Sequence, residues 1–197
     1  GDQESLAKPL GENLADIACE IIDQVFGNIA KMSTSGDHES EKVIQQILDT
    51  TRKYMPWSVS FFANERLVPM VNYLRDLTIE KNGHFYVTYP IDHSLANELL
   101  GHVEKMKDGN NACVPPALKA FTAVVDQGVT HLIREPKKML KFNVVVDKTL
   151  NGVIHVTTQL GYKRFDKLGK IYDANSISGY FDHFLVFLNN EQTQKND

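Results

Sequence analysis

The spacing of apolar residues changes along the chain, and this change most constrains the fold. Through most of the first two thirds of the sequence, apolar residues recur at intervals of three and four, the period of an amphipathic helix. Between residues 140 and 160 they recur at every second position, the period of a half-buried strand. The spacing predicts an α+β fold with about five helices, mostly N-terminal, packed on a mainly antiparallel sheet formed largely by the C-terminal third.

Turn and cap residues place the helices within this pattern. Pro56 is expected to end the second helix and Pro136 the fifth, because proline disrupts a helix interior. Asn82-Gly83 is expected to close the third helix as a C-cap. The predicted helices span residues 11–31, 39–54, 69–81, 93–106 and 115–134.

The alternating segments after residue 139 predict a β-hairpin whose register follows from burial. A two-residue Asn151-Gly152 turn would put Val144 and Ile154 on opposite faces, whereas a five-residue loop, 148–152, puts them on the same face. Because a slip of one residue exposes the whole apolar set, the longer loop is predicted. Strands are predicted at residues 57–62, 84–89, 140–146 and 154–160, with 162–175 continuing the sheet.

Length and composition bound the class of protein. The chain has 197 residues, 42% hydrophobic and 23% charged, and is predicted to be a single α+β domain over residues 1–197. Residues 1–10 and 191–197 are expected to fray. Residues 180–188 fit a helix or a buried strand, and a helix is preferred. The net charge of −4 argues against broad nucleic-acid or anionic-membrane binding, although a local basic patch stays open. No apolar run is long enough for a membrane helix.

The sequence contains none of the common nucleotide-binding, zinc-protease or serine-hydrolase motifs. Cys113 is the candidate nucleophile, because free amide groups at the start of the next predicted helix would favour a thiolate. The competing interpretation is a cysteine packed at a loop–helix junction. Glu98 and His102 are the candidate metal ligands, one helical turn apart, and a surface pair is the alternative.

Two polar sets are candidate binding sites. The first, on the second face of the predicted sheet, consists of Asn143, His155, Thr157 and Gln159. It would line a ligand site if a helix or partner covered it, and otherwise it meets water. The second is a basic cluster that consists of Lys163, Arg164, Lys167 and Lys170, joined in composition by Lys137, Lys138 and Lys141. It would attract a phosphate group, a nucleic acid or an acidic partner, and the preferred alternative is an edge-strand rim that discourages aggregation.

These features rank three classes of function. The leading hypothesis is a non-enzymatic regulatory or small-molecule-binding domain, as a monomer or a homodimer. The second is an enzyme that uses Cys113 or a His/Glu metal site, and the third is an assembly or adaptor protein that acts through its first helix. Cofactors are not identified, and the expected partner is a small molecule or a protein. The cytoplasm is favoured slightly over export, which stays open because Gly1 stands where a starting Met would.

Overall fold

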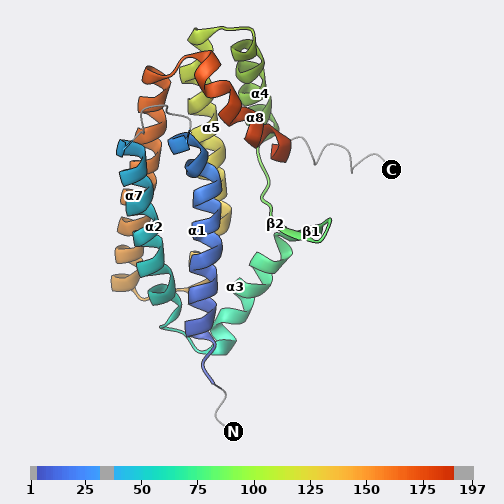
Figure 1. The fold of residues 1–197 in the computed structure, drawn as a ribbon. Coiled ribbons are helices and arrows are strands. Elements are labelled where there is room, and N and C mark those ends of the chain that lie inside the picture. Colours follow the sequence, from blue (N-terminus) through green and yellow to red (C-terminus); the bar gives the residue numbers. More distant parts are fainter. Residues whose placement is uncertain (1–3, 32–37, 189–197) are drawn as a thin grey trace.

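Long helices that lie side by side form most of the molecule (Figure 1). This computed structural model describes residues 4–31 and 38–188; of the predicted frayed ends, 1–3 and 191–197 lie outside it. The elements are α1 (Ala7–Lys31), α2 (His38–Val59), α3 (Asn64–Asp76), β1 (Thr78–Lys81), β2 (His84–Val87), α4 (His93–Lys107), η1 (Asn111–Cys113), α5 (Val114–Val129), η2 (Thr130–Arg134), α6 (Glu135–Leu140), α7 (Val144–Ile171) and α8 (Ala174–Leu188). α1 packs along α2, α7 packs against α2 and α5, and α4 packs against α5 and α8.

The fold is helical, and the predicted α+β architecture is wrong. Within the described ranges the strands are β1 and β2, an antiparallel pair in which Thr78 lies opposite Val87. Asn82 and Gly83 do not cap a helix but form the turn of this hairpin, with φ angles of 54° and 75°. Two-residue turns with positive φ match the twist of antiparallel strands. The predicted strand at 84–89 is therefore confirmed for residues 84–87, as half of a small protruding hairpin.

Residues 144–171, predicted as a hairpin and a further strand, form the single helix α7. Asn143 starts it, because its Oδ1 accepts hydrogen bonds from the backbone N–H groups of Val145 (3.1 Å) and Val146 (3.0 Å). The buried positions along α7 follow the helical spacing: Val146, Leu150, Gly161, Arg164, Phe165 and Leu168. The β-branched residues of this segment favour a strand locally, and burial against α2 and α5 overrides that preference.

Gly152 distinguishes the helix from the predicted hairpin by experiment. It lies exposed inside α7, and an added Cβ would meet nothing within 4 Å. Gly152→Ala should therefore raise the free energy of unfolding by about 0.5–1 kcal/mol, because glycine loses more backbone entropy in a helix. In a hairpin loop that required positive φ, the same change would be destabilising. Urea denaturation of the two proteins gives the sign.

Proline does not end the helices where the sequence suggests. α2 continues through Pro56 to Val59, so the predicted strand at 57–62 is wrong. Pro69 lies inside α3 rather than at its start, and Pro136 lies in the first turn of α6, which follows η2 directly. Each proline removes one backbone hydrogen bond, and packing of the helix offsets this cost.

Aromatic side chains fill the main core, where α5, α7 and α8 meet. Phe121 on α5 is 2% exposed. Its ring centroid lies between 4.9 and 5.7 Å from those of four others: Phe165, Tyr180, Phe181 and Phe184. Three of these belong to α8, so the helix preferred for residues 180–188 is confirmed.

Candidate functional site

A pocket of about 480 Å³ lies between α6 and α7 and collects basic side chains. Its cations come from the end of η2, from α6 and from the residue after α6, whereas α7 provides the opposite wall. We call this site the basic pocket; it is lined by Arg134, Lys137, Lys138, Lys141, Phe142, Asp147, Asn151, Ile154 and His155. Four of these side chains are cations and one is a carboxylate, which leaves three positive charges when His155 is neutral.

The chain between α6 and α7 is held in place by α3 and the turn before it. Arg66 Nη2 donates a hydrogen bond to the Leu140 carbonyl at 2.9 Å, and the Phe62 ring packs against Phe142 at 5.0 Å between centroids. Between these two anchors, Lys141 adopts φ 52° and ψ 63°, in the left-handed region that side chains rarely occupy. The fold thus keeps a lysine where glycine would be less strained, and such strain often marks a functional site.

One lysine of the basic pocket already has a carboxylate partner. Lys137 Nζ forms an ion pair with Asp147, and Asn151 Nδ2 donates to the same carboxylate at 3.0 Å. The hydrogen bond from Lys137 is the largest influence that lowers the pKa of Asp147 below its ordinary value. Asp147 therefore stays ionised near neutral pH and competes with any incoming anion for Lys137.

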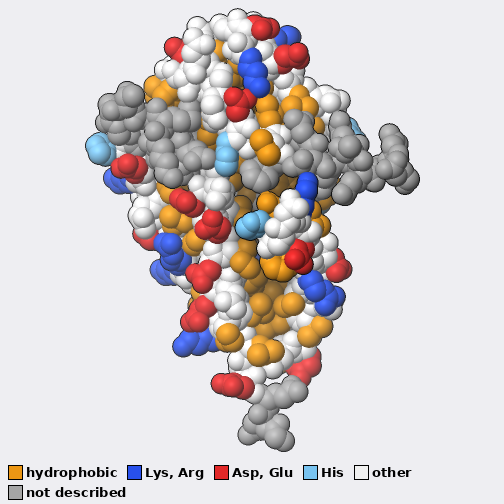
Figure 2. Space-filling view, turned by 45° about the vertical axis from the view of Figure 1, so that its right-hand side comes forward, with side chains coloured by type: hydrophobic (Ala, Val, Ile, Leu, Met, Phe, Trp, Pro, Cys, Tyr) orange, Lys and Arg blue, Asp and Glu red, His pale blue; other side chains and the backbone are white. Residues whose placement is uncertain are grey.

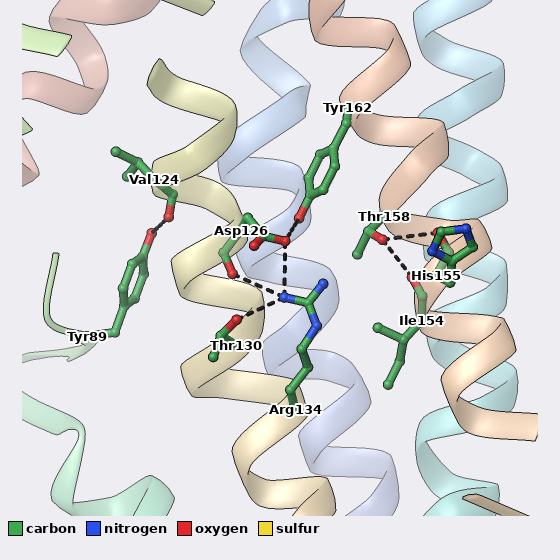
Figure 3. Close-up of polar contacts among 9 residues, drawn as sticks. All are labelled: Tyr89, Val124, Asp126, Thr130, Arg134, Ile154, His155, Thr158 and Tyr162. Carbon is green, nitrogen blue, oxygen red and sulfur yellow. Dashed lines mark hydrogen bonds and ion pairs between the residues drawn. The ribbon is translucent and has the colours of Figure 1, made fainter. Parts of the chain in front are cut away.

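Arg134 is oriented by a carboxylate that it shares with a tyrosine (Figure 3). Arg134 Nη1 donates to Asp126 Oδ1 at 3.0 Å and to Thr130 Oγ1 at 2.8 Å. From α7, the Tyr162 hydroxyl donates to the same Asp126 oxygen at 2.6 Å. Burial, followed by the hydrogen bond to Asp126, raises the pKa of Tyr162, so the hydroxyl keeps its proton and donates. This network fixes the guanidinium between α5 and α7 (Figure 3).

The segment η2 is a π-helical turn, and Pro136 accounts for it in part. In this turn the Glu135 N–H bonds to the Thr130 carbonyl, five residues back. The next carbonyl in that register, His131, would need the N–H of residue 136, which proline lacks. The Tyr73 hydroxyl of α3 donates to the His131 carbonyl instead, at 2.9 Å. The turn that positions Arg134 therefore depends on α3 as well as on the proline.

Two lysines of the basic pocket are open to a ligand. Lys138 pairs with Glu135 at 2.7 Å, but the Lys138 side chain is 69% exposed, and such surface pairs are weak in water. Among the ion pairs of the described residues, none involves Lys141, which is also exposed. An incoming anion can therefore engage Lys138 and Lys141 at the lowest cost.

Of the four polar residues predicted to share a sheet face, His155 alone lines the basic pocket. Asn143 lies just before α7 and its side chain caps that helix. Because a helix turns about 100° per residue, Thr157 lies about 200° away from His155 around the axis. Gln159 shares the His155 side of α7 but lies about 6 Å further along it, outside the pocket. The set is not brought together, because strand alternation does not apply to a helix.

The second predicted cluster lies on the C-terminal half of α7 and contacts the start of α2. Arg164 is 5% exposed; its Nε donates to Ser40 Oγ at 2.5 Å, and its Nη1 lies 3.2 Å from Glu39 Oε2. Lys167 pairs with the same Glu39 at 2.6 Å. The other two members are Lys163 and Lys170. Half of the cluster thus holds two helices together, and the edge-strand interpretation does not apply.

The predicted nucleophile and the predicted metal ligands lie apart from the basic pocket. Cys113 directly precedes α5 and is 8% exposed in the main core, where a substrate in solvent would not reach its thiol. His102 Nε2 lies 4.0 Å from Glu98 Oε1 on α4. No group of three His, Cys, Asp or Glu side chains suited to a metal ion occurs in residues 4–31 and 38–188. Both sites stay predictions from the sequence.

An apolar surface over α1 and α3 is a further feature of the molecule. Figure 2 shows apolar side chains gathered on the lower half of this face. Ile17 on α1 and Val68 on α3 are 49% and 52% exposed. Phe26, in contrast, stacks on Phe165 at 4.9 Å in the core. The predicted assembly through the first helix would therefore have to use Ile17 rather than Phe26.

The sequence pattern does not identify Arg134 and Phe142 as members of the basic pocket. A signal for the α7 wall was present, because Asp147, Asn151 and His155 recur every four residues and so share one helical face. When the segment is interpreted as strands, that spacing no longer indicates a helical face.

No protein-family profile matches the chain, and neither a curated protein nor a solved structure is similar enough to it to indicate a relationship. In the part of the chain that the structure describes, every helix is too short or too polar to cross a membrane.

Proposed function

We propose that this protein is a non-enzymatic binding domain for a small anionic ligand, a phosphate or carboxylate compound, held in the basic pocket. The observation that carries the proposal is the convergence of four cationic side chains on one concave site. Oxyanions form charge-assisted hydrogen bonds with lysine and arginine, and a guanidinium can bind two oxygens at once. Phe142 and Ile154 supply an apolar wall for the rest of the ligand.

The contacts around the pocket suggest how a ligand would be held. Lys138 and Lys141 are exposed and would engage the anion first. Arg134 is fixed by Asp126 and needs little reordering to meet it, which lowers the entropic cost of binding. Binding rather than catalysis is proposed, because the one carboxylate in the lining is already engaged by a lysine and an asparagine.

Titration with inorganic pyrophosphate, followed by amide and imidazole NMR shifts, tests the proposal. The largest shifts are expected at Lys141, Asn151 and His155. Lys141→Gln should weaken binding about tenfold, because it removes one charge-assisted hydrogen bond. The matched control is Lys163→Gln, which makes the same charge change on α7 outside the pocket and should leave the affinity unchanged. Equal weakening by both variants, or shifts spread over the surface, would contradict a pocket.

Asp147→Asn should have the opposite effect on the anion. It releases Lys137 from its partner and removes the only negative charge of the lining, so the affinity for pyrophosphate should rise several-fold. The free energy of unfolding should fall slightly, because the negative charge of Asp147 in the first turn of α7 interacts favourably with the helix dipole. Calorimetric titration gives the first result and urea denaturation the second. An unchanged or weaker affinity would show that the anion does not approach Lys137.

A further inference from the structure

The first turn of α7 presents two valines to solvent beside the basic pocket. Val144 is 69% exposed and Val145 is 74% exposed. At about 100° per residue, Val144 lies within about 20° of His155 around the axis of α7, so it continues the helix face that lines the pocket. Single exposed aliphatic residues are common on proteins, but this pair adjoins a charged site.

Three lysines precede or follow the two valines in the chain. Lys138 and Lys141 line the pocket, and Lys148 follows Val144 by about one turn of α7. All three lysines are exposed, and within the described residues no ion pair involves Lys141 or Lys148. We call these five residues, Lys138, Lys141, Val144, Val145 and Lys148, the α7 corner.

The segment that leads into the α7 corner makes contacts with α3, with the turn before α3 and with the first turn of α7. The Leu140 carbonyl accepts a hydrogen bond from Arg66 at 2.9 Å, and Phe142 packs on Phe62. Asn143 then caps the first turn of the helix. The valines are therefore held outward in the folded protein, so presenting them to a partner needs little further ordering.

We infer that the α7 corner docks onto an anionic membrane surface, with the valines entering the lipid interface and a lipid phosphate in the basic pocket. This inference rests on the proposed function, and it identifies the anion in the basic pocket as a lipid phosphate. Burial of aliphatic side chains in the interface and attraction of lysines to anionic headgroups are the two components of peripheral membrane binding. A free phosphate compound would use the lysines but leave both valines in water.

The net acidity of the chain argues against broad binding to anionic membranes, so the docking rests on the local charge of the α7 corner. The net charge is −4, but interactions between exposed charges are screened over about 8–10 Å at physiological ionic strength. The corner carries three lysines, of which Lys138 pairs with Glu135; Asp147 in the first turn of α7 is engaged by Lys137. Figure 1 shows the first turns of α7 at the lower left margin of the molecule.

Sedimentation of the full chain with unilamellar vesicles tests the inference. The protein should pellet with vesicles of phosphatidylcholine mixed with phosphatidylserine and stay in solution with phosphatidylcholine alone. The double variant Val144→Ser, Val145→Ser should lower the vesicle partition coefficient about tenfold and leave pyrophosphate binding unchanged. Lys138→Gln and Lys141→Gln should each weaken vesicle binding about fivefold and weaken pyrophosphate binding too.

Val156→Ser is the matched control for the valines. Val156 is 60% exposed on the same helix and lies about 16 Å along it from Val145. It should change neither vesicle nor pyrophosphate binding. Vesicle binding that falls equally in Val156→Ser and in the double variant would overturn the assignment to the α7 corner.

The two proposals fail in different ways. If the protein binds pyrophosphate but not anionic vesicles, the membrane inference is wrong and the proposed function stands. If it binds neither, the proposed function fails. Binding of soluble heparin with equal affinity in the wild type and the valine variant, without vesicle binding, would identify an acidic macromolecule as the occupant and overturn the membrane inference.

Discussion

Replacing Phe121 with alanine is expected to lower the free energy of unfolding by about 3–5 kcal/mol. Phe121 is 2% exposed, and its ring meets the rings of Phe165 on α7 and of Tyr180, Phe181 and Phe184 on α8. The substitution leaves a cavity at the point where three helices join, and the surrounding rings cannot collapse into it fully.

Urea denaturation followed by far-UV circular dichroism measures this loss. The control is Phe85→Ala, because Phe85 is 74% exposed on β2 and its removal should change stability by less than about 0.5 kcal/mol. A loss for Phe121→Ala no larger than that of the control would mean that the helices do not meet around this ring.

Gly11→Ala should destabilise the protein by about 1–3 kcal/mol, although alanine is the better helix former. Gly11 lies in α1 where that helix crosses α2. An added Cβ would lie 2.6 Å from Pro56 Cα and 2.7 Å from Val59 Cγ2. The first of these atoms is backbone, so it can move aside only if the two helices separate.

Gly152→Ala is the matched comparison for Gly11→Ala. Both changes add one methyl group inside a helix, but Gly152 has open space around it and should gain stability. Opposite signs of the two changes, measured by urea denaturation, would support the observed crossing of α1 and α2. A stabilising effect of Gly11→Ala would show that the helices are further apart.

The first helices could be predicted from sequence because their apolar spacing fits the helical period. Residues 180–188 fit both a helix and a buried strand, and the helix preferred there is confirmed. α1, α2, α4 and α5 all appear close to their predicted ranges. In α7 the apolar residues fit both the strand period and the helical period, so local pattern alone does not decide between them. The β-branched side chains between positions 144 and 158 favour a strand, which is why the sequence predicts strands there.

The contacts that favour a helix over strands for residues 144–171 come from distant parts of the chain. Phe165 stacks on Phe26 of α1, and an added Cβ at Gly161 would lie 3.0 Å from that same Phe26 ring. A strand would turn half of these buried side chains to the opposite face and lose the contacts. The Asn143 cap was a local signal in favour of the helix, but its meaning depended on the helix already being recognised.

The candidate site, like the fold, could be predicted from the sequence only in part. The sequence predicted an anion site at Lys163, Arg164, Lys167 and Lys170, with the lysines around α6 joined to it in composition, and it placed His155 in a separate polar set. It did not show that His155 and the lysines around α6 share a pocket, because the relevant geometry is a helical face across from α6.

By itself, then, the sequence determined which segments have a single apolar period, where charge gathers, and that no common catalytic motif is present. Only the tertiary structure decided that residues 144–171 are a helix, that α3 holds the chain before it, and that His155 and Lys141 line one pocket. The physical reason is that burial against distant residues exceeds the small local preferences for helix or strand, and those distant contacts exist only in the folded chain.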